Sequence, residues 1–165
     1  MGKTESEILA DVYDKVRSLS KMFIGGLKGI DLDKRLEIDN IKFNSAYWIV
    51  AHLVWTEHFL IIQGIGGEDM KIDWLNEYGF GSDPEKVKIK PPFEEILKKL
   101  DEVHIKAVEI IRGLSDKQLE EDNFIDANFG GSKAKRNVIT HAIRHEPMHI
   151  GQISWILKSN GIKFA

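Results

Sequence analysis

Three histidines recur at four-residue intervals near the C-terminus, as His141, His145 and His149 within THAIRHEPMHIGQ. A step of four residues on an α-helix turns the side chain by only about 40°, so neighbouring members of this row lie on one face. Neutral imidazole is a good ligand for Zn, Ni, Cu or Fe, and two adjacent members can converge on one ion. The outer two lie about 12 Å apart along the axis and share an ion only awkwardly. The spacing alone does not exclude an alternative, in which the three histidines form a polar stripe whose nitrogens are satisfied by hydrogen bonds.

The position of His52 favours metal binding over a hydrogen-bonded polar stripe. It stands in the middle of an apolar segment, SAYWIVAHLVWTEHFLIIQG, where an imidazole without a polar partner would be costly to desolvate. A second helix that already offers two histidines can supply that partner through a shared ion. We therefore predict a divalent-metal site formed by His52, His145 and His149. Three nitrogen ligands leave coordination open for water or substrate, as a catalytic metal needs, whereas a structural zinc is normally closed by a fourth protein ligand.

The other histidines are expected to have different roles. His141 could orient the ligands, transfer protons at the mouth of the site, or be a polar residue near the start of its helix, and the sequence leaves these three open. His58 lies six residues after His52, about 240° around the helix, and is expected to face away from the site. His104 has no neighbour at ligand spacing, so both it and His58 are interpreted as structural.

Two further features flank the predicted ligands. Pro147, between the two ligands of the last helix, has no N–H to donate to the carbonyl of Ile143, so a kink or local bulge is expected there. Such a bend is either tolerated or adjusts where the ligands point. Trp48 and Trp55 share one side of their helix with His52, and they either wall a pocket or belong to the core.

Four long segments have the periodicity or the continuous apolar character of helices. Asn44 or Ser45 can cap the second, Pro92 suits the first turn of the third, and Gly161 can end the fourth. Strand signals are few and short, so we predict an all-α four-helix bundle. The expected helices span about 5–29, 45–64, 92–113 and 133–160, with a short helical turn at 115–121, and the first is expected to bury Ile8, Val12, Val16, Leu19, Phe23 and Leu27.

The connection 66–91 is too long for a tight helical hairpin. It predicts that the second and third helices are joined by a long crossover. Within it, DWLNEYGFG carries three aromatic residues, and we expect this stretch to cover an end of the bundle.

Composition excludes several classes of protein. The chain has 165 residues, of which 42% are hydrophobic and 30% charged, as expected for one globular domain over residues 1–165. Without cysteine, a metal must be held by nitrogen or oxygen. A net charge of -3 gives no broad attraction for nucleic acid. We expect no membrane span and no secretory signal, and hence a cytoplasmic protein.

The motifs NSAYWIVAHLVWTEHFLI, around His52, and HAIRHEPMHIGQI, in the last helix, resemble those of the DinB/YfiT-like metalloenzymes. The resemblance covers most of the chain. It implies a four-helix bundle with a crossover between the second and third helices, often as a homodimer. It also implies that His52, His145 and His149 bind a divalent metal such as zinc or nickel.

The resemblance also suggests a reaction. Characterised relatives include bacillithiol S-transferases and mycothiol-dependent isomerases, in which a metal activates a low-molecular-weight thiol cosubstrate, and some members are induced under stress. The implied function is a metal-dependent thiol S-transferase acting on electrophilic small molecules. Two alternatives remain open from the residues: a hydrolase that uses a metal-bound water, and a non-catalytic metal-binding bundle.

Overall fold

The computed structural model describes residues 2–163, and helices dominate it, which confirms the all-α prediction. Four long helices form the bundle, and the Thr4 and Ser45 side chains cap the first two by accepting bonds from backbone N–H groups. No helix in the described part of the chain is long and apolar enough to cross a membrane. The helices are α1 (Glu5–Gly25), α2 (Ala46–Glu57), α3 (Phe93–Arg112), α4 (Asp116–Glu120) and α5 (Lys135–Ser159), and the only paired strands among these residues are β1 (Glu37–Ile38) and β2 (Ile41–Lys42).

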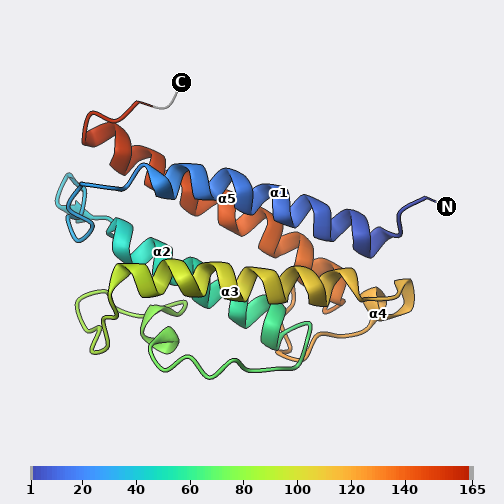
Figure 1. The fold of residues 1–165 in the computed structure, drawn as a ribbon. Coiled ribbons are helices and arrows are strands. Elements are labelled where there is room, and N and C mark those ends of the chain that lie inside the picture. Colours follow the sequence, from blue (N-terminus) through green and yellow to red (C-terminus); the bar gives the residue numbers. More distant parts are fainter. Residues whose placement is uncertain (1, 164–165) are drawn as a thin grey trace.

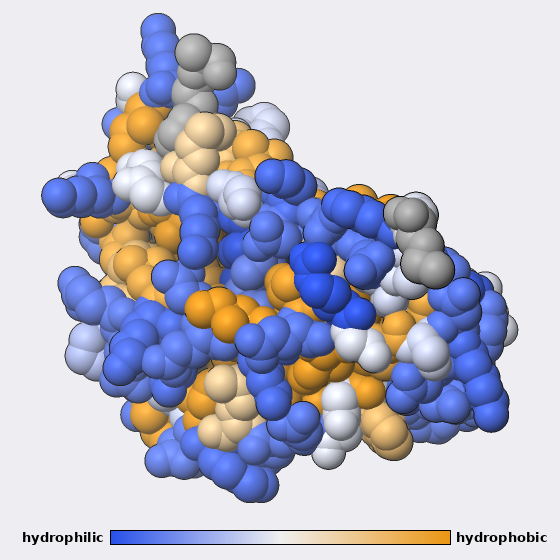
Figure 2. Space-filling view, turned by 45° about the vertical axis from the view of Figure 1, so that its right-hand side comes forward, coloured by the Kyte–Doolittle hydropathy of each residue, from blue (hydrophilic) through white to orange (hydrophobic). Residues whose placement is uncertain are grey.

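The four long helices pack in a closed ring in which α1 and α2 are diagonal. α1 contacts α3 and α5, and α2 contacts the same two helices. In Figure 1, α2 and α3 both run from left to right, so the chain must return along the bundle between them, and the connection 64–92 does so below α2 and α3. Polar residues cover most of the face seen in Figure 2, with smaller apolar areas between them.

The connection 64–92 covers the side of α2 and not an end of the bundle, which corrects the expectation for DWLNEYGFG. Its 3-10 helix, η2 (Leu75–Tyr78), is buried against α2. The Tyr78 ring lies 6.0 Å from that of Tyr47 near the start of α2, and Gly79 lies against the indole of Trp55 near its end. Because α2 is buried around nearly its whole circumference, it needs this cover in addition to α3 and α5.

The second helix ends differently from the prediction. After Glu57 the chain continues as a π-helix, η1 (His58–Gln63), in place of a single α-helix over 45–64. π-Turns insert an extra residue into a helix and are frequent near functional sites. The backbone N–H of Met70 donates to His58 Nε2 at 3.0 Å, which ties the crossover connection to this turn.

The prediction for the first helix holds only in part: Leu27 is buried, and Val16 and Phe23 are partly buried. Ile8, Val12 and Leu19 are about half exposed. The face that packs into the bundle lies about one residue further round, and it consists of Ser6, Ala10, Tyr13, Arg17, Ser20 and Ile24. A buried arginine decides this rotation, because its charge must meet its partners inside the protein.

Arg17 is the centre of a buried ionic network that joins the four long helices. Its Nε and Nη2 donate to the two carboxylate oxygens of Glu146 on α5, at 2.8 and 2.9 Å. Nη2 also donates to Glu57 on α2 at 2.9 Å, and Nη1 donates to the carbonyl of Leu100 on α3 at 2.8 Å. Glu57 is completed by His104, whose Nδ1 lies 2.7 Å from its other oxygen. Burial alone would lower the pKa of Arg17, but the two carboxylates raise it above its usual value, so the charge persists in the core.

Removing this arginine should strongly destabilise the protein. In Arg17→Met, two carboxylates stay buried without their cation, and we expect the free energy of unfolding to fall by about 3–5 kcal/mol. Urea denaturation measures it. The matched control is Arg112→Met, which removes a largely exposed pair with Asp11 and should leave the urea midpoint close to wild type. Equal midpoints for the two variants would contradict a dominant role for the network.

Candidate metal centre

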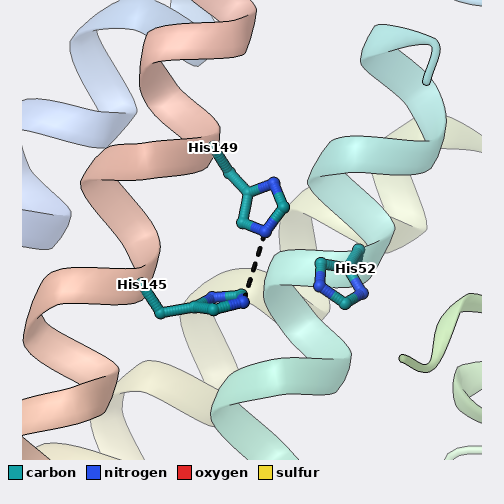
Figure 3. Close-up of side chains that lie close together, drawn as sticks. All are labelled: His52, His145 and His149. Carbon is teal, nitrogen blue, oxygen red and sulfur yellow. Dashed lines mark hydrogen bonds between the residues drawn. The ribbon is translucent and has the colours of Figure 1, made fainter. Parts of the chain in front are cut away.

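The structure brings His52 of α2 together with His145 and His149 of α5. One ring nitrogen from each lies within 4.8 Å of the others, and Figure 3 shows the three rings converging between the two helices. The Nε2 atoms of His145 and His149 are 3.3 Å apart. Two nitrogens bound at 2.0–2.1 Å in a tetrahedral site are separated by roughly 3.3 Å, so this pair already has the spacing of zinc ligands. That the cluster binds a metal stays a prediction.

Hydrogen bonds at Nδ1 orient two of the rings, and the Nε2 of His52 lies 3.3 Å from Thr56 Oγ1. The Nδ1 of His52 lies 2.7 Å from the carbonyl oxygen of Tyr78, and that of His149 lies 2.9 Å from Gln152 Oε1. Both partners accept, so each Nδ1 carries the proton and each Nε2 presents a lone pair. Among the described residues, His145 Nδ1 is buried without a hydrogen-bond partner.

Either tautomer of His145 leaves a polar conflict among the ring nitrogens. With its proton on Nδ1, its Nε2 lone pair faces that of His149 at 3.3 Å, which is repulsive. With its proton on Nε2, the ring can donate to His149, but Nδ1 is buried without a partner in either tautomer. A cation placed among the three Nε2 atoms removes the first conflict. The residues present thus fit a divalent ion that accepts imidazole nitrogen.

Burial keeps these imidazoles neutral. Desolvation lowers the pKa of His52 to about 4, against a smaller opposite effect of the Tyr78 carbonyl. Desolvation also lowers the pKa of His145 to about 3, assisted by the neighbouring histidines, and it lowers the pKa of His149. Since only neutral imidazole binds a metal, the ligand form predominates well below neutral pH.

Two tryptophans of α2, one before and one after His52 in the sequence, stack on its imidazole ring. Trp48, one turn before it, stacks on the imidazole with ring centroids 4.7 Å apart and an interplanar angle of 12°. Trp55, one turn after it, lies 5.6 Å away at 19° and stacks in turn on Phe59. Trp48 is buried and Trp55 partly so. The core interpretation is confirmed for Trp48, and Trp55 packs against the core; both rings stack on His52.

His141 lies at the edge of the cluster. Its ring stacks on Phe129 with centroids 3.8 Å apart and is 5.7 Å from the ring of His145. Burial lowers its pKa, with Arg144 acting in the same direction. No ligand-orienting hydrogen bond links it to the three clustered histidines, so its role as a proton-transfer group or as a plain polar residue stays open.

His58 and His104 lie outside the cluster, and both are buried with polar partners. His58 accepts from the backbone of Met70, and the Nε2 of His104 lies 3.2 Å from Asp14 Oδ1. These contacts agree with a structural role for each. Sequence reasoning missed what His104 joins, namely the network around Arg17.

Pro147 does not produce the expected bulge. α5 stays α-helical through it from Lys135 to Ser159, and the π-helix is η1, which follows α2. Pro147 is on the exposed face of the helix, where solvent can reach the backbone carbonyl that its missing N–H leaves unpaired.

A comparison with known families identifies the chain. The family model of the DinB superfamily matches residues 13–153, a span that contains all three clustered histidines. The chain belongs to the DinB superfamily. The resemblance stated from the sequence motifs is thereby confirmed. No curated protein matches the chain.

Two residues that support this DinB-superfamily site were not found from the sequence. Gln152 lies three residues after His149, a spacing that places the two side chains on one helix face and could have revealed it. Tyr78 contributes a backbone carbonyl from the end of η2, 26 residues away from His52, and a main-chain group leaves no signal in a residue pattern.

Metal content should depend on the clustered histidines alone. We expect about one equivalent of zinc or nickel per chain in the untagged wild type, and almost none in His145→Ala or His52→Ala, because two nitrogens hold an ion far more weakly than three. Inductively coupled plasma mass spectrometry measures the content. His141→Ala is the control on the same helix, and it should keep the metal. Equal content in wild type and His145→Ala would contradict the assignment.

The bound metal should survive mild acid. A histidine with an ordinary pKa near 6.5 is mostly protonated at pH 5.5, and the proton would compete with the metal. Here the pKa values of about 4 and about 3 for His52 and His145 keep both rings neutral at that pH. Dialysis against a weak chelator at stepped pH should release the metal mainly below pH 5. Release that follows an ordinary histidine titration, centred near pH 6.5, would contradict these environments.

Proposed function

We propose that the protein is a metal-dependent transferase that joins a low-molecular-weight thiol to an electrophilic small molecule. A divalent ion, with zinc or nickel the best candidates, would lower the pKa of a thiol in its open coordination position. In the overall reaction a sulfur–carbon bond forms, the bond from that carbon to its leaving group breaks, and the thiol proton departs with the leaving group. Membership in the DinB superfamily supports this proposal, as does the open histidine cluster.

The openness of the ligand set supports a catalytic role. The candidate metal group contains three histidines and no fourth side chain among the described residues. A tetrahedral or larger coordination shell therefore keeps a position for an exogenous ligand. A structural zinc site would be expected to fill that position with the protein.

The pairing of the nearby carboxylates favours a thiol over water as the nucleophile. Glu146 directly follows His145, and Glu57 lies five residues after His52, but both are bound by Arg17. Neither is free to take a proton from a metal-bound water, as the general base of a metal-dependent hydrolase does. A thiol, with an unperturbed pKa near 8.5, needs less help to ionise. This observation carries the choice of reaction.

The chain's own groups orient the site and shield it from water. The Tyr78 carbonyl and the Gln152 amide fix the ring rotations of His52 and His149. Trp48 and Trp55 cover His52 and limit the approach of water. Such fixed ring orientations are what a reaction requires when its nucleophile must meet one electrophilic carbon.

A homodimer is also proposed. The apolar residues that α1 leaves about half exposed recur at spacings of three, four and seven, which is typical of a helix that packs on another helix. They are Ile8, Val12, Leu19 and Met22. Sedimentation of the 18.8 kDa chain tests this assembly directly.

Thiol conjugation should depend on the metal. We expect the zinc- or nickel-loaded protein to join bacillithiol, mycothiol, coenzyme A or glutathione to monochlorobimane, with at least one of these thiols clearly preferred. Chelation or His145→Ala should reduce the rate on the order of 100-fold, because the thiol then keeps its proton. Fluorescence of the conjugate measures the reaction.

The alternatives give different results in the same assay. Failure with every thiol, together with chelator-sensitive cleavage of an ester or amide, would identify a hydrolase and overturn the transferase. Failure in both assays, with a stoichiometric and firmly bound metal, would leave a non-catalytic metal-binding bundle.

A further inference from the structure

A concave apolar groove lies beside the candidate metal centre, between α2, α5 and the β1–β2 hairpin. Its volume is about 310 Å³. The side chains that line it are all uncharged, and only two of them are polar. They are Leu36, Ile38, Phe43, Asn44, Ile49, Gln152, Trp155 and Ile156, which we call the apolar groove.

The apolar groove is formed in part by the two helices that carry the clustered histidines. Ile49 lies three residues before His52 on α2, and Ile156 lies seven residues after His149 on α5. These spacings place the lining residues on the same helix faces as the ligands, one or two turns away. The two helices that carry the candidate ligands therefore also form two walls of the groove.

Gln152 belongs to both features. Its Oε1 lies 2.9 Å from His149 Nδ1, and the same residue lines the apolar groove. Gln152 therefore links the groove to His149, through the Nδ1 side of its ring. Two of the apolar residues that line the groove are unusually exposed for their type. Trp155 is 68% exposed and Ile38 is 53% exposed. Such large apolar groups at the rim of a concavity are the usual lining of a small-molecule site.

We infer that the apolar groove binds a neutral apolar group of the substrate, such as an aromatic ring, while the reactive end of that substrate lies at the histidine cluster. This inference rests on the proposed function. A volume of 310 Å³ corresponds to roughly ten water molecules, and so to a group of about ten non-hydrogen atoms. The absence of charge in the lining selects against carboxylate, phosphate or ammonium substituents at this position.

The size of the groove favours a small molecule over a second copy of the chain. A stable protein interface buries roughly 800 Å² on each partner and involves about 20 residues or more. The apolar groove has eight lining residues and a volume that suits one ring. The exposed face of α1 is a separate surface, and none of its apolar residues lines the groove.

Hydroxamates test the inference, because their head group binds zinc and their tail can be varied. Affinities of acetohydroxamate and benzohydroxamate for the zinc-loaded protein are compared by calorimetry. We expect the phenyl compound to bind at least roughly tenfold more tightly. Trp155→Ala and Ile38→Asp should reduce this ratio to below about threefold. Ile105→Asp is the matched control: Ile105 is 62% exposed on α3, away from the groove, and its change should leave the ratio as in wild type.

A ratio that the groove variants do not change would overturn the inference. If neither hydroxamate binds, the open metal centre of the proposed function fails, and the groove is then tested alone. Benzyl alcohol is titrated into metal-free protein while the indole N–H signal of Trp155 is followed by NMR. A saturable shift supports the groove, and no shift overturns it. A dimer that Trp155→Ala dissociates would also overturn it, since a second copy would then occupy the groove.

Discussion

A full positive charge sits in the middle of this bundle, and the helices are arranged around it. The side chain of Arg17 is almost fully buried, which would be prohibitive without compensation. Carboxylates from α2 and α5 and a carbonyl from α3 supply that compensation. Because each bond needs its own helix in the correct rotation, the network allows few alternative packings. A purely apolar core would accept several rotations at similar cost.

The same network is adjacent in sequence to the candidate ligands. Glu146 follows His145, so the pair of bonds between Glu146 and Arg17 sets the rotation of α5 at the point where the histidine projects. On α2, Glu57 plays the corresponding part for the helix that carries His52. One side of each helix thus faces an ionic core, and a neighbouring side presents imidazole to the gap between α2 and α5 (Figure 3). The histidine cluster and the ionic network are two consequences of one packing arrangement.

The histidine cluster could be predicted because its reason is local. The four-residue spacing places His145 and His149 together on any α-helix, and the buried position of His52 demands a polar partner. The same argument would have exposed Glu57, a charged residue within the same apolar run, and through it the need for a cation. Arg17 gave no comparable signal, since its neighbours in sequence are those of an ordinary amphipathic helix, and the apolar stripe beside it pointed to a face that is only partly buried.

The proposed chemistry depends on three imidazoles binding one divalent ion with coordination left open. X-ray absorption spectroscopy at the metal edge of the zinc-loaded protein tests this most directly. We predict three imidazole nitrogens at about 2.0–2.1 Å, together with one or more light atoms that exchange for sulfur when a thiol is added. A spectrum without imidazole scattering, or with a closed set of four protein ligands that a thiol leaves unchanged, would contradict it.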